Sequence, residues 1–279
     1  MRIPPVLAEH WRQDQEWLDA LPRLVAECAA AWDLELEQPF ETPGSLVVPA
    51  GGVVLKLNAP AHFEAEHESD ALAWWGGAGA VRLLARDDDR RALLLERCVP
   101  GTTLVASGAD ETAVVPGLLE RLRHTPRPGH PYRLLVDQAR RWAVELPERF
   151  ERGGRPFERS LLDAALDVFD TVDPRADRLV NQDVHGWNVL RAQREPWLVI
   201  DPKPVVGEPE LDGVGLLRNA GFRGSRDDIR RWLDILVGLG LDRERLRGWG
   251  FAHALAWGVE PDGRWSERSI AAARAISCA

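Results

Sequence analysis

Three polar residues in the second half of the chain have types and spacing that suit metal-assisted chemistry. Four residues separate Asp183 from Asn188, and twelve more separate Asn188 from Asp201. One carboxylate can orient a hydroxyl group and take its proton, while the second carboxylate and the amide oxygen are ligands of the kind that Mg²⁺ prefers. The pattern therefore favours phosphoryl transfer, which depends mainly on neutralising charge and orienting the acceptor.

The order of these three residues assigns each of them a role. Asp, Asn and Asp follow one another at the same spacing in the catalytic segment of the protein-kinase architecture. We therefore interpret Asp183 as the catalytic base, and Asn188 and Asp201 as ligands of Mg²⁺. Asp and Asn are also common in turns and at strand ends, but the joint spacing, with an apolar segment before each acid, favours the catalytic interpretation.

Lys56 and Glu68 form a candidate ion pair in the first half of the chain. Lys56 follows the apolar residues 53–55, where a strand end would present its amine to nucleotide phosphates. Glu68 interrupts a helical stripe of apolar residues, and burying an unpaired acid costs several kcal/mol. We expect Glu68 to pair with Lys56, the alternative being that it lies at the solvent-exposed edge of the stripe.

The residues before position 98 predict a mainly antiparallel sheet that carries one long helix. Apolar alternation and turn residues mark the strands, and apolar residues spaced by four and three mark the helix. The expected strands span residues 34–40, 45–48, 53–57, 81–85 and 92–96, and the expected helix spans residues 62–76. The sheet would position Lys56, and the helix would position Glu68.

After position 97 the pattern is mostly helical. The expected helices span residues 110–124, 132–149 and 158–172, with several more between 214 and 275. One strand pair, 188–190 and 197–200, lies beside the candidate catalytic residues. We predict an α+β fold with a nucleotide-binding domain at residues 1–97 and a helical domain with the catalytic loop and substrate site at residues 98–279.

The composition is that of a globular protein and excludes several functions. The 279 residues are 45% apolar, and 44 acidic residues outnumber 35 basic ones, for a net charge of −9. This charge opposes a general role in coating nucleic acid or anionic membranes and better tolerates a cationic small molecule. Three distant cysteines predict neither a disulfide framework nor a zinc cluster. No run of 18 apolar residues occurs, and we expect a cytoplasmic protein without a membrane partner.

The chain resembles the aminoglycoside phosphotransferases, most closely their streptomycin and hydroxyurea resistance kinases. The resemblance covers most of the chain and includes His185, two residues after the candidate base. It is carried by residues 79–84, 92–97, 183–185, 188–190, 197–202 and 207–212. One departure is Asn181-Gln182, where many relatives have His-Gly before the catalytic Asp.

This resemblance implies a bilobal protein-kinase-like fold and an enzyme that uses ATP or GTP with Mg²⁺ to phosphorylate an alcohol group. The expected acceptor is a small cationic molecule, an aminoglycoside such as streptomycin. Backbone groups from Glu96 to Cys98 would contact the purine. The loop that contains Gly44 and Ser45 is the candidate cover of the phosphates.

For several residues the sequence supports two different roles. Acids after the metal site suit a polycationic acceptor and equally suit helix capping in water; they are Glu208, Glu210, Asp212, Glu260 and Asp262. Trp187 either touches substrate or packs, and Lys203 either approaches phosphate or is solvated. Two other functions remain open. The first is phosphorylation of another hydroxylated or amine-bearing metabolite. The second is that of a nucleotide-binding pseudokinase, and the intact Lys56 and Asp183 argue against this second function. The oligomeric state stays open.

Overall fold

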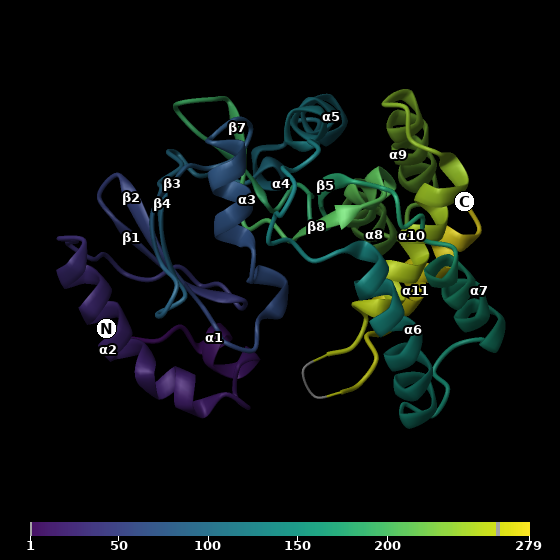
Figure 1. Cartoon of the computed structure of the whole chain (residues 1–279), viewed down its shortest axis with the longest axis horizontal. Helices are drawn as coiled ribbons and strands as arrows, with labels where there is room; N and C mark the ends of the chain where they lie inside the picture. Colours follow the sequence, from purple (N-terminus) through teal and green to yellow (C-terminus); the bar gives the residue numbers. More distant parts are fainter. Residues whose placement is uncertain (1, 261–262) are drawn as a thin grey trace.

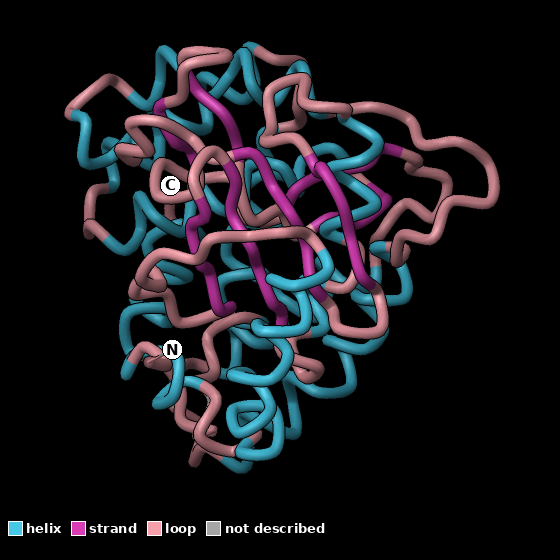
Figure 2. The backbone as a smooth tube through the Cα atoms, turned by 90° about the vertical axis from the view of Figure 1, so that its left-hand side faces the viewer, coloured by secondary structure: helices cyan, strands magenta, loops and turns pink. Residues whose placement is uncertain are grey.

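The computed structural model describes residues 2–260 and 263–279 and has two lobes (Figure 1). The smaller lobe, purple to blue in Figure 1, contains an antiparallel sheet with the strand order β1-β2-β4-β3. Figure 2 shows these strands side by side. The strands are β1 (Ser45–Ala50), β2 (Val53–Asn58), β3 (Leu83–Asp87) and β4 (Ala92–Glu96).

Side-chain alternation along β2 decides which helix each residue meets. Leu55 and Leu57 are fully buried in a cluster with α2 (Gln15–Ala31). Because successive side chains point to opposite faces of a sheet, Lys56 points to the other face. That side of the sheet faces α3 (Glu68–Trp75), as Figure 1 shows. The other helices of this lobe are α1 (Pro5–His10) and the short 3-10 helix η1 (Phe63–Ala65).

Three expectations for the smaller lobe are wrong in detail. Residues 34–40 form no strand, although Glu37 N and Phe40 N donate hydrogen bonds of 2.8 and 2.9 Å to backbone oxygens of β1. Pro39 lacks an N–H group, so this segment cannot complete a ladder. The expected helix at residues 62–76 is split into η1 and the shorter α3, and β3 begins two residues later than expected.

The larger lobe is mainly helical, as predicted (Figure 1). Its helices are α4 (Leu104–Ser107), α5 (Glu111–Leu122), α6 (Leu135–Arg152), α7 (Arg159–Asp170), η2 (Pro209–Gly213), α8 (Val214–Phe222), α9 (Arg226–Gly238), α10 (Arg243–Ala256) and α11 (Glu267–Ser277). Two antiparallel strand pairs lie among them: β5 (Arg178–Asn181) with β8 (Pro204–Gly207), and β6 (Val189–Arg191) with β7 (Trp197–Val199). The sequence predicted only the second pair. Throughout the described ranges, every helix is too short or too polar to cross a membrane.

One apolar core joins α3 and β4 to the larger lobe. Trp75, at the end of α3, donates from Nε1 to the carbonyl of Leu122 at 2.8 Å. Val81 N donates to Val199 O at 3.0 Å, which connects the smaller lobe to the β6–β7 hairpin. Since both lobes contact α3, the position of Glu68 is fixed relative to the catalytic segment.

Candidate active site

The loop between β5 and β6 brings the candidate base and one candidate metal ligand into contact. Asn188 Nδ2 donates to the side-chain Oδ2 and to the backbone oxygen of Asp183, both at 3.1 Å. The backbone N–H of Asn188 donates to His185 O at 2.8 Å, and its carbonyl accepts from Ile200 N at 2.9 Å. These bonds close the loop and bring Asp201, the next residue, beside it.

Lys56 bridges the smaller lobe and the catalytic segment. Its Nζ lies 2.6 Å from Glu68 Oε1 and 2.6 Å from Asp201 Oδ1, so the expected contact with Glu68 is present. Glu68 is completely buried, and Asn58 donates to its other oxygen at 3.0 Å. Burial would lower the pKa of Lys56, but the charges of Asp201 and Glu68 outweigh it and raise the pKa. The amine therefore stays charged.

Asp201 carries two signs of a functional position. Its φ is 51°, a left-handed conformation that is strained for a residue with a side chain. Its Oδ1 also lies 2.5 Å from Lys203 Nζ, in addition to the contact with Lys56. Burial would raise the pKa of Asp201, but the two lysines outweigh it and hold the pKa below its ordinary range. The carboxylate is ionised and held on one oxygen.

Asp183 is also held in its ionised form. NH2 of Arg218 lies 2.5 Å and Nε2 of His185 3.3 Å from Asp183 Oδ1. Burial would raise the pKa of Asp183, but the hydrogen bond with His185 and the charge of Arg218 outweigh it and lower the pKa to about 2. An ionised carboxylate is the form that accepts a hydrogen bond from an alcohol.

Asn181 connects the two catalytic segments. Its Oδ1 accepts from the backbone N–H of Asp183 at 3.1 Å and from that of Lys203 at 2.9 Å. Its own N–H donates to Asp212 Oδ1 at 2.9 Å, and Arg123 Nε donates to the other oxygen of Asp212 at 2.8 Å. The residue that departs from the resembled pattern therefore fixes the base relative to the segment after Asp201.

Glu96 and Cys98 lie at the junction of the lobes. The Glu96 carboxylate pairs with Arg194 at 2.6 Å, so this side chain joins the junction to the larger lobe. The backbone N–H and C=O of Cys98 have no hydrogen-bond partner among the described residues, which leaves them available to a purine. Burial, followed by the charge of Glu96, raises the pKa of the Cys98 thiol to about 12, so the thiol is neutral and unreactive.

Gly44 and Ser45 lie at the start of β1. The Gly44 carbonyl accepts from Trp11 Nε1 at 3.1 Å, so the residue after α1 fixes this loop. Ser45 is buried and its hydroxyl donates to Asn58 Oδ1 at 2.6 Å. The Ser45 hydroxyl therefore holds Asn58, which in turn donates to Glu68, and the cover of the phosphates by the loop that contains Gly44 and Ser45 stays a prediction.

Three of the five acids that suit either an acceptor or helix capping have structural partners. Glu208 accepts from Arg245 NH2 at 2.7 Å and from Trp249 Nε1 at 2.8 Å, and it is buried. Glu210 accepts from Asp242 N at 3.1 Å, and Asp212 holds Asn181. These three acids stabilise the larger lobe. Glu260 is exposed, and Asp262 lies outside the described residues.

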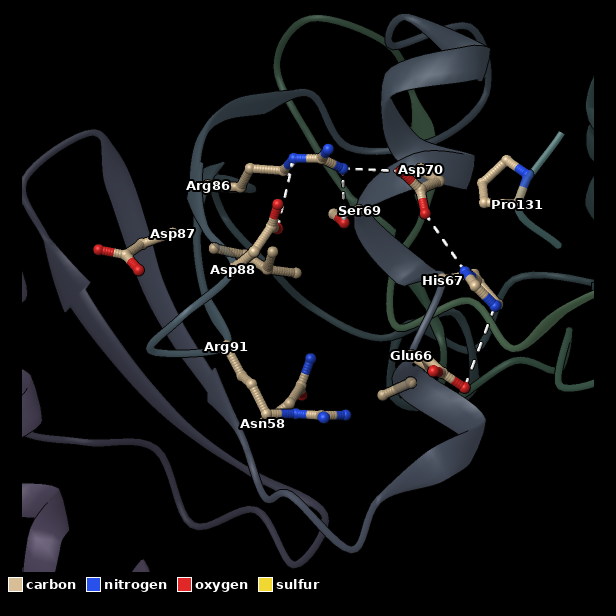
Figure 3. Close-up of a pocket in the computed structure, with 12 residues that line it drawn as sticks. Asn58, Glu66, His67, Ser69, Asp70, Arg86, Asp87, Asp88, Arg91 and Pro131 are labelled. Atoms are coloured by element: carbon tan, nitrogen blue, oxygen red, sulfur yellow. Dashed lines mark hydrogen bonds and ion pairs between the residues drawn. The ribbon is translucent and has the colours of Figure 1, made fainter. Parts of the chain in front are cut away.

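A cavity of about 350 Å³ lies between α3 and the β3–β4 hairpin (Figure 3). Arg86 reaches from β3 to α3, with NH1 2.7 Å from Asp70 Oδ1 and 3.2 Å from Ser69 Oγ. Each Asp that lines it is paired: Asp70 and Asp88 with Arg86, and Asp87 with Arg90. None of the predicted site residues lines this cavity, whose polar side chains brace α3 against the sheet.

The site residues fit a magnesium ion that also binds phosphates. Asn188 uses its amide nitrogen for Asp183, and Asp201 uses Oδ1 for two lysines. Asn188 Oδ1 and Asp201 Oδ2 have no hydrogen-bond donor within the described chain. The described residues contain no cluster of three or more His, Cys, Asp or Glu side chains that would hold a metal alone. Mg²⁺ needs only one or two protein oxygens when phosphates and water complete its octahedron.

Three contributors to the site were not expected from the sequence. Asn58 lies two residues after Lys56, and the period of a strand puts both on one face, which is a usable signal. Asn181 precedes the base by two residues, and its only sequence signal is that many relatives have His-Gly in place of Asn181-Gln182. Arg218 lies 35 residues from Asp183 on α8, and no local pattern marks it.

Comparison with protein families matches residues 32–268 to the family described as aminoglycoside/hydroxyurea antibiotic resistance kinase. Streptomycin 6-kinase of Streptomyces griseus is 36% identical, over 93% of this chain and 92% of that protein. Hydroxyurea phosphotransferase of Kitasatospora aureofaciens is 38% identical, over 94% of this chain and 80% of that protein.

Solved structures have the same fold at low sequence identity. A choline kinase from Streptococcus pneumoniae has a TM-score of 0.62 at 12% identity, covering 85% of this chain and 88% of that one. An aminoglycoside phosphotransferase in a ternary complex with AMP-PNP and hygromycin B has a TM-score of 0.57 at 16% identity, covering 88% and 93%. The predicted bilobal, protein-kinase-like α+β fold is confirmed.

Proposed function

Because the chain belongs to the aminoglycoside/hydroxyurea antibiotic resistance kinases, we propose that it transfers the γ-phosphate of ATP, with Mg²⁺, to a hydroxyl of an aminoglycoside such as streptomycin. It is a small-molecule phosphotransferase with an alcohol group as acceptor. The observation that carries the proposal is the contact of Lys56 with Asp201, beside the contact of Asn188 with Asp183. These contacts bring together a phosphate-binding cation, two metal ligands and a base.

The nucleotide lies between residues 1–97 and 98–279 in this proposal. The free backbone groups of Cys98 bind the purine, and Lys56 binds phosphate oxygens. Glu68 keeps the Lys56 amine in place, since the pair is buried and only 2.6 Å apart. Asn188 and Asp201 hold Mg²⁺, which neutralises charge on the phosphates when it is bound.

The acceptor hydroxyl lies against Asp183. The carboxylate is ionised, with its pKa lowered to about 2, so it orients the hydroxyl by accepting its hydrogen bond. It takes the proton only as the bond from oxygen to phosphorus forms, when the alcohol becomes a much stronger acid. Lys203 and Lys56 both contact Asp201 Oδ1, and in this proposal they supply positive charge to the phosphates.

A small uncharged acceptor such as hydroxyurea is a second candidate. The side chains that contact Asp183 are Asn188, His185 and Arg218, and none of them is an acid. Three of the five acids that suit a polycation, Glu208, Glu210 and Asp212, are bonded within the larger lobe. One of the similar proteins is named a hydroxyurea phosphotransferase.

Release of ADP from the purified protein tests the proposal. The assay compares streptomycin, hydroxyurea and choline at equal MgATP, with GTP and with EDTA as further conditions, and mass spectrometry detects the phosphorylated product. We expect turnover of streptomycin that requires the metal and falls by ~10² to 10⁴ in Asp183→Asn. Turnover of hydroxyurea alone selects the second candidate, and no turnover of either molecule contradicts both.

A further inference from the structure

Arg218 makes the shortest side-chain contact of the candidate base. It lies on α8, is 8% exposed, and places NH2 2.5 Å from Asp183 Oδ1. Asn188 Nδ2 donates to the other oxygen, Oδ2, at 3.1 Å. His185 Nε2 also lies near Oδ1, but at 3.3 Å, so Arg218 is the closest donor to that oxygen. Close donors on both oxygens fix the plane of a carboxylate, whereas a close donor on one oxygen leaves it free to rotate.

Two aromatic side chains hold the guanidinium of Arg218. His253 Nδ1 lies 3.3 Å from Arg218 NH1, and the guanidinium carbon lies 4.9 Å from the centre of the Trp257 ring. The two rings contact each other in a tilted arrangement, with their centres 4.3 Å apart and their planes at 42°. His253 is completely buried, and burial, followed by the charge of Arg218, holds the pKa of its imidazole well below the ordinary value. A neutral ring accepts the hydrogen bond of Arg218 at Nδ1.

We propose that Arg218, held by His253 and Trp257, is a positioning residue that sets the orientation of the Asp183 carboxylate toward the acceptor hydroxyl. This role rests on the proposed function, in which Asp183 orients that hydroxyl. A reacting group displaced by about 1 Å loses roughly 10²-fold in rate. Without Arg218, Oδ1 keeps only the longer contact with His185, and we expect kcat to fall by ~10². Binding of ATP is unaffected, because Arg218 contacts neither Lys56 nor Asp201.

Arg245 provides a matched control in the same lobe. Like Arg218, it pairs with a carboxylate, that of Glu208 at 2.7 Å, and lies over an indole ring, that of Trp249 at 5.4 Å. Its other hydrogen bond goes to Thr171. Because none of these partners belongs to the catalytic loop, Arg245→Ala removes a comparable structural ion pair without touching Asp183.

The experiment compares wild type, Arg218→Ala, Arg218→Lys and Arg245→Ala. Each protein is assayed for phosphorylation of streptomycin and, without an acceptor, for slow hydrolysis of MgATP, with Tm and the Kd of ATP measured alongside. We expect kcat on streptomycin to fall by ~10² in Arg218→Ala and by less in Arg218→Lys, with the Kd of ATP within about twofold of wild type. Low millimolar guanidinium chloride restores part of kcat in Arg218→Ala but not in Arg245→Ala.

The outcomes separate the positioning role from the proposed function. If wild type hydrolyses MgATP and ignores streptomycin, the acceptor is wrong, and the comparison of variants proceeds on hydrolysis, where water replaces the alcohol. If Arg218→Ala matches Arg245→Ala in kcat, the positioning role is overturned. It is equally overturned if Arg218→Ala loses ATP binding together with kcat and guanidinium restores neither, because the residue is then structural.

Discussion

Lys56 Nζ lies 2.6 Å from Asp201 Oδ1, although 145 positions separate the two residues in the chain. The same nitrogen lies 2.6 Å from Glu68 Oε1. A single amine on β2 therefore joins α3 to the segment that supplies a candidate metal ligand. Since Glu68 is completely buried, its charge depends on this amine and on Asn58.

Removal of Lys56 is expected to destabilise the fold as well as to abolish activity. Lys56→Met leaves the buried Glu68 carboxylate without its cation, and breaking a buried pair on one side costs about 3–5 kcal/mol. The free energy of unfolding from urea titration measures the loss. The double variant Lys56→Met with Glu68→Gln, which removes both charges, recovers much of it. Equal stability of the single and double variants contradicts the buried-pair argument.

The Lys56 and Glu68 pair shows which part of the site can be predicted from the sequence. An acid within an apolar helical stripe predicts a buried partner, because burying an unpaired charge is costly. Lys56, at the end of an apolar strand, is the nearest candidate, and these two arguments together predict the pair. The length of α3 was overestimated, because apolar spacing continues through η1 while the backbone breaks at Glu66 and His67. Periodicity records which residues share a face and carries no information on where the hydrogen-bond ladder stops.

Contacts between distant segments were beyond prediction. Asn181 accepts from the backbone N–H groups of Asp183 and Lys203, which lie in different segments. Arg218 contacts Asp183 because α8 packs against the catalytic loop. Each depends on tertiary packing of β5 with β8, a strand pair that the sequence did not reveal because β8 is buried throughout and begins with a proline and ends with a glycine. Short buried strands have no alternation to detect.

Asp201→Asn is expected to remove the response to metal while keeping the backbone. Asn tolerates the left-handed φ of 51° found at this position, so the substitution removes the charge and leaves the local conformation. Wild type gains in Tm when ATP is added with Mg²⁺ rather than with EDTA, because a ligand that binds only the folded state stabilises it. In Asp201→Asn this metal-dependent part disappears, while Asp227→Asn, at an exposed acid, retains it. A full metal-dependent shift in Asp201→Asn rules out that ligand.

Asp183 is expected to contribute to acid unfolding. Its pKa in the folded protein is lowered from 3.8 to about 2, so the ionised carboxylate stabilises the fold above pH ~4. This contribution, ~2 kcal/mol, is lost as the pH falls from ~4 to ~2. Asp183→Asn has no carboxylate to protonate, so its free energy of unfolding falls less steeply across this range. Identical pH dependence in the two proteins, followed by circular dichroism, contradicts the lowered pKa.

Gly215 is expected to control the position of the catalytic loop. A Cβ atom at Gly215 on α8 would lie 2.5 Å from the backbone oxygen of Val184, the residue after the candidate base. Backbone cannot yield as a flexible side chain does, so Gly215→Ala pushes the loop away and lowers kcat by ~10², the usual effect of a displacement of about 1 Å.

Gly117 on α5 supplies the control for this substitution, because a Cβ there meets nothing within 4 Å. Gly117→Ala improves helix propensity and raises the free energy of unfolding by ~1 kcal/mol, with kcat unchanged. The Kd of ATP separates the two possible causes of low activity in Gly215→Ala: it stays near the wild-type value if only the loop has moved. Wild-type kcat in Gly215→Ala means that α8 and the loop move together, and that their close approach does not set the position of Asp183.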